Sequence, residues 1–76
     1  MRELIEYVAR SLVDEPAAVE VREVRTSPTI VYQLQVATSD VGKVIGKHGR
    51  TAQSLRLLLS ATAARTGCKA VLEIKE

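Results

Sequence analysis

Aromatic residues and cysteine are scarce in this sequence of 76 residues. It contains two tyrosines, no phenylalanine, no tryptophan and a single cysteine, Cys68. One cysteine excludes an intramolecular disulfide and any metal site built on cysteine pairs. We expect no metal ion and no cofactor. Because aromatics are so few, a nucleic-acid ligand would have to be held mainly by contacts other than base stacking.

The sequence also lacks the features of an enzyme, a secreted protein or a membrane protein. His48 is the only histidine, and no nucleophile–base pair or ligand cluster is visible, so we expect no catalytic residue. Met1 is followed by an amphipathic stretch with Glu3 and Glu6, unlike a signal peptide. No apolar run approaches the length that crosses a bilayer, and we expect a cytoplasmic protein.

Length and composition indicate one small domain covering residues 1–76. A chain of this size buries only about 60% of the surface that it exposes when unfolded, which leaves no room for a deep cleft between two domains. Apolar residues make up 46% of the sequence, enough for a core.

Acidic residues are absent between Val41 and Cys68, although the net charge of the whole chain is only +2. The same stretch holds five basic residues: Lys43, Lys47, Arg50, Arg56 and Arg65. A stretch of one sign in a nearly neutral protein favours a local anion site. A solvated basic helix is the alternative on charge alone.

Periodicity predicts an α+β fold with the order α-β-β-α-α-β and three helices on one face of a three-stranded sheet. We expect helices over 2–13, 41–45 and 50–66, and strands over 19–25, 30–37 and 70–75. The first two strands should form an antiparallel hairpin, with Ile30, Tyr32, Leu34 and Val36 on its apolar face. Ser39 or Asp40 is suited to cap the second helix.

The segment Gly46-Lys47-His48-Gly49 separates two predicted helices by a tight turn. Glycine at each end permits backbone angles that side chains resist, and it lets a sugar-phosphate chain approach closely. The helix that starts at Arg50 adds free N–H groups and a partial positive charge, which suit a phosphate. We expect Lys43, Lys47 and Arg50 each to reach a phosphate oxygen. An ordinary corner between two helices is the competing interpretation.

The run Val41-Gly42-Lys43-Val44-Ile45-Gly46-Lys47-His48-Gly49-Arg50 resembles the V-I-G-x-x-G core of KH domains of type II, in which the loop clamps about four nucleotides of single-stranded nucleic acid. The chain is most similar to the KhpA family of small bacterial KH proteins. This resemblance implies binding of single-stranded RNA, as an RNA chaperone or post-transcriptional regulator. It also implies a homodimer, or a heterodimer with a larger KH protein of the KhpB/Jag type. All residues of the run from Gly42 to Arg50 become candidate RNA contacts, with Ile45 on the groove floor.

In a KH domain the bases lie in a groove beside this loop. We expect one wall to be the helix pair and the other the strand at 30–37, with bases against Val44 and Ile45. With few aromatics, sequence preference should be weak.

The helix predicted at 50–66 has more apolar residues than one sheet can bury. Ala52, Leu55, Leu59 and Ala63 form a stripe that we assign to the core. Leu57, Ala61 and Ala64 fall on the far side, with Leu58 between the two. This second set predicts a dimer interface, although isolated exposed leucines are common. A protein-interaction module with a KH shape and no RNA role, or a binder of single-stranded DNA, remains as an alternative function.

Overall fold

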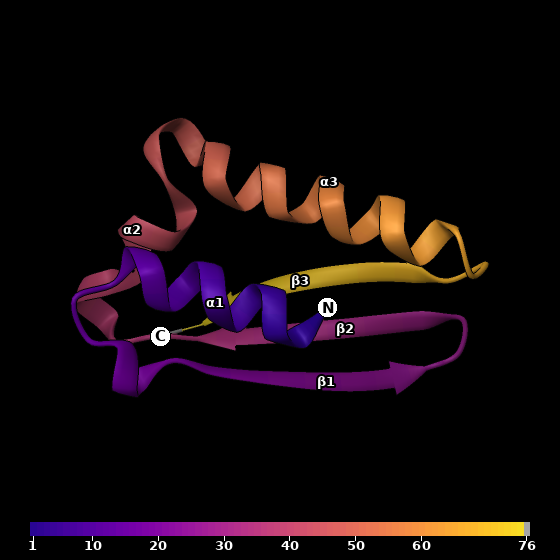
Figure 1. The fold of residues 1–76 in the computed structure, drawn as a ribbon, viewed down its shortest axis with the longest axis horizontal. Coiled ribbons are helices and arrows are strands. Elements are labelled where there is room, and N and C mark those ends of the chain that lie inside the picture. Colours follow the sequence, from indigo (N-terminus) through magenta and orange to yellow (C-terminus); the bar gives the residue numbers. More distant parts are fainter. Residues whose placement is uncertain (76) are drawn as a thin grey trace.

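The computed structural model describes residues 1–75. The predicted order of helices and strands is confirmed, and each boundary agrees within two residues (Figure 1). The elements are α1 (Arg2–Leu12), β1 (Glu20–Thr26), β2 (Thr29–Gln35), α2 (Val41–Ile45), α3 (Arg50–Ala64) and β3 (Lys69–Lys75). Short 3-10 turns at Pro16–Ala18, Thr38–Asp40 and Lys47–Gly49 fill three of the connections.

The three strands form one mixed sheet in the order β1-β2-β3. β1 pairs with β2 in the antiparallel sense, as predicted, whereas β3 runs parallel to β2. A parallel pair needs a crossover connection, and here it consists of α2, the glycine loop and α3. The loop therefore lies in the middle of the crossover, at the end of the sheet where β2 stops (Figure 1).

One face of the sheet carries the core. The predicted apolar face is confirmed, because Ile30, Tyr32 and Leu34 of β2 and Val36, directly after it, are all buried. They pack in one cluster with residues of all three helices, among them Ile5, Val44 and Leu59, so the helices cover the same face. On the opposite face Val24 and Val71 flank Val31 in register and are 45% and 43% exposed.

The predicted division of α3 into two faces is also confirmed. The four residues assigned to the core stripe are at most 8% exposed: Ala52, Leu55, Leu59 and Ala63. Leu57 is 71% exposed and Leu58 is 52% exposed. Gly67, with a φ of +73°, ends the turn that follows the helix. Within residues 1–75, no helix combines the length and the apolarity that a membrane span requires.

Candidate nucleic-acid interface

The loop Gly46-Lys47-His48-Gly49 has backbone angles that explain its two glycines. Gly46 has a φ of +82° and Gly49 a φ of +73°. His48 between them also has a positive φ, of +58°, which costs a residue with a Cβ atom roughly 1–2 kcal/mol. Two backbone hydrogen bonds hold the turn, from the Gly46 N–H to the carbonyl of Gly42 at 3.0 Å and from the Gly49 N–H to the carbonyl of Gly46 at 3.0 Å. The loop is thus a tight and specific structure.

The cations nearest the loop differ in whether they form ion pairs with carboxylates. Lys47 and Arg50 are exposed and form no ion pair within residues 1–75. α3 begins directly after Gly49 with no side-chain cap and no acidic residue in its first turn. Its first N–H groups therefore keep their partial positive charge beside these two side chains.

Lys43 is not free in the same way. Its ammonium contacts the carboxylate of Asp14 and lies 3.5 Å from Oδ1 of Asp40. These carboxylates raise the pKa of Lys43, Asp14 most of all. A phosphate that binds Lys43 must compete with Asp14, so Lys43 stays a predicted phosphate contact but differs from Lys47 and Arg50 in being paired.

Asp40 has a different role from the helix cap that the sequence suggested. It stands at the N-cap position of α2, but its side chain makes no capping hydrogen bond. Instead, the fully buried carboxylate accepts the N–H of Asp14 at 3.2 Å and that of Glu15 at 3.1 Å. Burial acts to raise the pKa of Asp40, but these two N–H groups and the Lys43 ammonium outweigh it and lower that pKa.

The expected groove needs two further corrections. Val44 is 1% exposed and belongs to the core, so only Ile45, at 37%, offers an apolar surface beside the loop. β2 pairs with a strand on each side, so it has no open edge to present as a groove wall. The edge strand beside α3 is β3 (Figure 1). Nη2 of Arg56 donates to the carbonyl of Leu72 in this strand at 3.3 Å.

The far side of α3 exposes the predicted apolar patch, which consists of Leu57, Leu58, Ala61 and Ala64. A hollow of about 330 Å³ adjoins it, lined by Val8 of α1 and by Arg50, Thr51, Ser54, Leu55 and Leu58 of α3. Because Leu58 belongs to both, the patch and the hollow form one continuous surface. Nothing in the pattern of α3 alone predicts the hollow, since Val8 comes from another helix.

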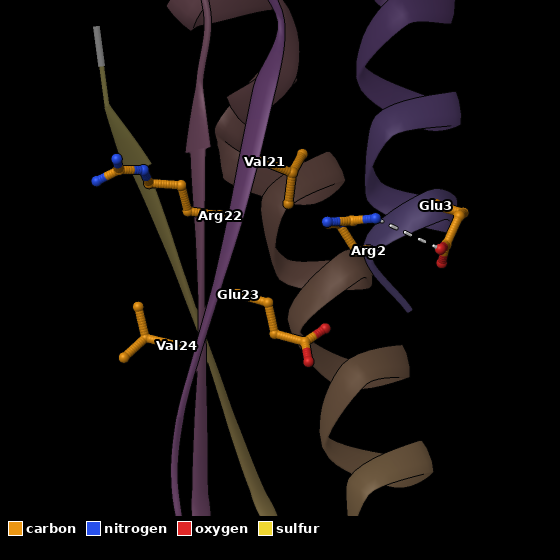
Figure 2. Close-up of a pocket in the computed structure, with 6 residues that line it drawn as sticks. All are labelled: Arg2, Glu3, Val21, Arg22, Glu23 and Val24. Carbon is orange, nitrogen blue, oxygen red and sulfur yellow. Dashed lines mark ion pairs between the residues drawn. The ribbon is translucent and has the colours of Figure 1, made fainter.

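A further hollow, of about 670 Å³, lies along β1 and the start of α1. Figure 2 shows that its lining wraps around the strand: Val21 and Glu23 point toward the helices, whereas Arg22 and Val24 point to the other side. Arg2 and Glu3 complete it, with a guanidinium–carboxylate distance of 3.9 Å. Cations and carboxylates alternate here, so this hollow has no net preference for an anion.

Comparison with known proteins shows the family of this chain. The family described as "KhpA/KhpB, KH domain" matches residues 2–74. The chain is 46% identical over 76 residues to the RNA-binding protein KhpA of Chlamydia trachomatis, covering 100% of this chain and 97% of that one. It is 53% identical over 72 residues to the KhpA of Treponema pallidum, covering 95% and 90%.

The chain is also 46% identical over 74 residues to the KhpA of Caldanaerobacter subterraneus, covering 97% of this chain and 99% of that one. The family match extends from the start of α1 to residue 74, so it includes the glycine loop, the crossover and all of the sheet except the last residue of β3. With this coverage and these identities, the chain belongs to the KhpA/KhpB family of KH domains.

Proposed function

We propose that this protein binds single-stranded RNA by clamping its backbone with the loop Gly46-Lys47-His48-Gly49. The observation that carries the proposal is the combination of a glycine turn, an uncapped helix start and two unpaired cations, Lys47 and Arg50, at one place. The relatives at 45–53% identity are named as RNA-binding proteins, which supports the same assignment.

In this proposal the phosphates lie against the loop and the first turn of α3. Lys47 and Arg50 neutralise them, and Gly42 leaves open space for the chain to approach, since nothing lies within 4 Å of where its Cβ would be. The bases lie against Ile45 and toward the open edge of β3, near Arg56. Val44 supports the loop from the core.

We further propose that the patch on α3 pairs the protein with a second copy or with a larger KH protein of the KhpB/Jag type. Pairing would give one RNA two clamps and raise affinity through avidity. An RNA chaperone or post-transcriptional regulator in the cytoplasm would use such a weakly selective, paired clamp.

The test replaces Lys47 and His48 together with aspartate. Both are exposed, so the fold should persist by circular dichroism, while two carboxylates facing phosphates should weaken RNA binding at least ~10-fold. Fluorescence anisotropy with a labelled RNA measures the affinity. An RNA of about eight nucleotides is long enough, since one KH loop holds ~four.

The matched control carries the same change in charge at the opposite end of the sheet, as Lys69→Asp with Thr26→Asp. It should bind RNA almost as well as the unaltered protein. Equal loss in both double variants would mean that only net charge matters, and unchanged binding in the loop variant would remove the clamp from the mechanism. The same sequence as DNA tests whether the sugar is distinguished.

A further inference from the structure

Asp40 is the one charged residue that is fully buried within residues 1–75. A carboxylate out of contact with water is unfavourable unless hydrogen bonds and an opposite charge compensate it. Both are present, in the two backbone N–H groups and in Lys43. Lys43 belongs to the first turn of α2, the helix that Asp40 precedes, but the two N–H groups belong to Asp14 and Glu15. The carboxylate therefore connects segments that are distant in the sequence.

The segments that Asp40 joins are the end of α1 and the start of α2. Asp14 and Glu15 follow α1 by two and three residues, and they lie 26 and 25 positions before Asp40. Lys43 completes the connection by contacting Asp14 and Asp40 together. We call this set of four residues the Asp40 clasp.

α2 depends on such a connection because it is short. It has five residues, far below the length at which a helix is stable alone, and it buries only Val44 in the core. Val44, the partly buried Val41 and the Asp40 clasp therefore attach this short helix to the rest of the fold. The Gly46 N–H bonds to the carbonyl of Gly42 in this helix, so a displacement of α2 displaces the start of the loop.

We propose that Asp40 is a positioning residue for the RNA clamp: by tying the chain after α1 to the start of α2, it holds Gly46-Lys47-His48-Gly49 ready for the RNA backbone. The inference rests on the proposed function of the loop, but the claim that Asp40 orders the loop can be tested in the free protein. A loop that is already ordered loses less conformational entropy on binding, and loss of the clasp should therefore weaken binding without removing any phosphate contact.

The test is Asp40→Asn. Asparagine keeps the shape of the side chain and one acceptor oxygen, but its NH2 group replaces the second oxygen and cannot accept a backbone N–H. We expect faster hydrogen exchange in the free protein at the amides of Asp14, Glu15, Gly46 and Gly49, each of which donates a hydrogen bond. RNA affinity should fall by about 5- to 10-fold under conditions in which the variant is fully folded. The control, Ile30→Val, alters the core at the far end of β2 and should leave loop exchange and RNA affinity unchanged (Figure 1).

The outcome that overturns the proposal is faster exchange at Asp14 and Glu15 with unchanged exchange at the loop, or an affinity that falls equally in both variants. A second measurement uses the unaltered protein, in case Asp40→Asn does not fold. By reciprocity, saturating RNA should slow exchange at Asp14 and Glu15. Unchanged exchange there would also overturn the proposal. If the unaltered protein binds no RNA, the proposed function fails, while loop exchange in Asp40→Asn still decides the positioning role.

Discussion

Thr51 occupies the space that a side chain on Gly46 would need. A Cβ atom on Gly46 would lie 2.7 Å from the Cβ of Thr51 and 2.9 Å from its backbone nitrogen, closer than real contacts of this kind. The backbone nitrogen cannot move away unless the first turn of α3 moves with it. Gly49 differs, because its φ is also positive but nothing lies within 4 Å of a Cβ atom there.

Gly46→Ala and Gly49→Ala should therefore have unequal effects. Gly49→Ala adds only left-handed strain and should lower the free energy of unfolding by roughly 1–2 kcal/mol. Gly46→Ala adds a collision to the same strain, and we expect a loss at the high end of single substitutions, about 3 kcal/mol or more. Urea unfolding of the two variants measures the difference, and equal losses would mean that the loop adjusts freely.

The dependence of RNA binding on salt should report two phosphate contacts. Lys47 and Arg50 are free, so the slope of log affinity against log salt should be near −1.4, at about 0.7 per contact on a single strand. Asp14→Asn removes the carboxylate that competes for Lys43 but keeps the backbone N–H that Asp40 accepts, and it should steepen the slope toward about −2. Arg50→Gln should instead reduce the slope by about 0.7. A slope near −2 in the unaltered protein would show that Lys43 leaves Asp14 when RNA binds.

Asp40 should give the protein a characteristic loss of stability in acid. Its pKa is lower in the folded protein than the ordinary value of 3.8, so the unfolded chain binds the proton more readily. Its contribution to stability is therefore complete above about pH 4 and declines as the pH falls through the lowered pKa of the folded state. Asp40→Asn should be less stable at neutral pH and should lose less stability below about pH 4. Parallel stability–pH curves, from urea midpoints, would contradict this role for Asp40.

Ala61→Asp tests the patch on α3. In a monomer the new carboxylate would lie in water with little effect, whereas in a dimer it would be desolvated at a cost on the order of several kcal/mol. We expect a shift to monomer in sedimentation at constant helix content, and weaker RNA binding through lost avidity. Ala17→Asp, at an exposed position in the turn after α1, is the matched control. If the unaltered protein is already a monomer at high concentration, the patch serves another partner.

Local periodicity was enough to predict most of this fold. Alternation placed Tyr32 and Leu34 in the core, and a spacing of 3.6 residues separated buried Leu59 from exposed Leu57. These predictions succeed because each depends only on which face of one element is apolar. The glycine loop was predicted for the same reason, since its backbone requirement is local.

The environment of Asp40 could not be predicted in this way. Its partners, Asp14 and Glu15, are about a third of the chain away and contribute backbone N–H groups, which every residue has except proline. The pairing of Lys43 with Asp14 and the central place of β2 likewise depend on how distant segments meet. A pair three residues apart, Asp40 and Lys43, was the one local signal available.

Because β3 runs parallel to β2, α3 must return the chain along the sheet, and the length of α3 fixes where both ends of this helix lie. A helix of 15 residues spans about 22 Å, and a strand of seven residues spans about 23 Å. The helix and the strand are therefore closely matched in length. β3 begins at the opposite end of the sheet from the loop, where the Lys69 N–H donates to the carbonyl of Pro28 at 2.8 Å. Adding or deleting a residue in α3 would rotate its faces by 100° and misplace either the glycine turn or this bond.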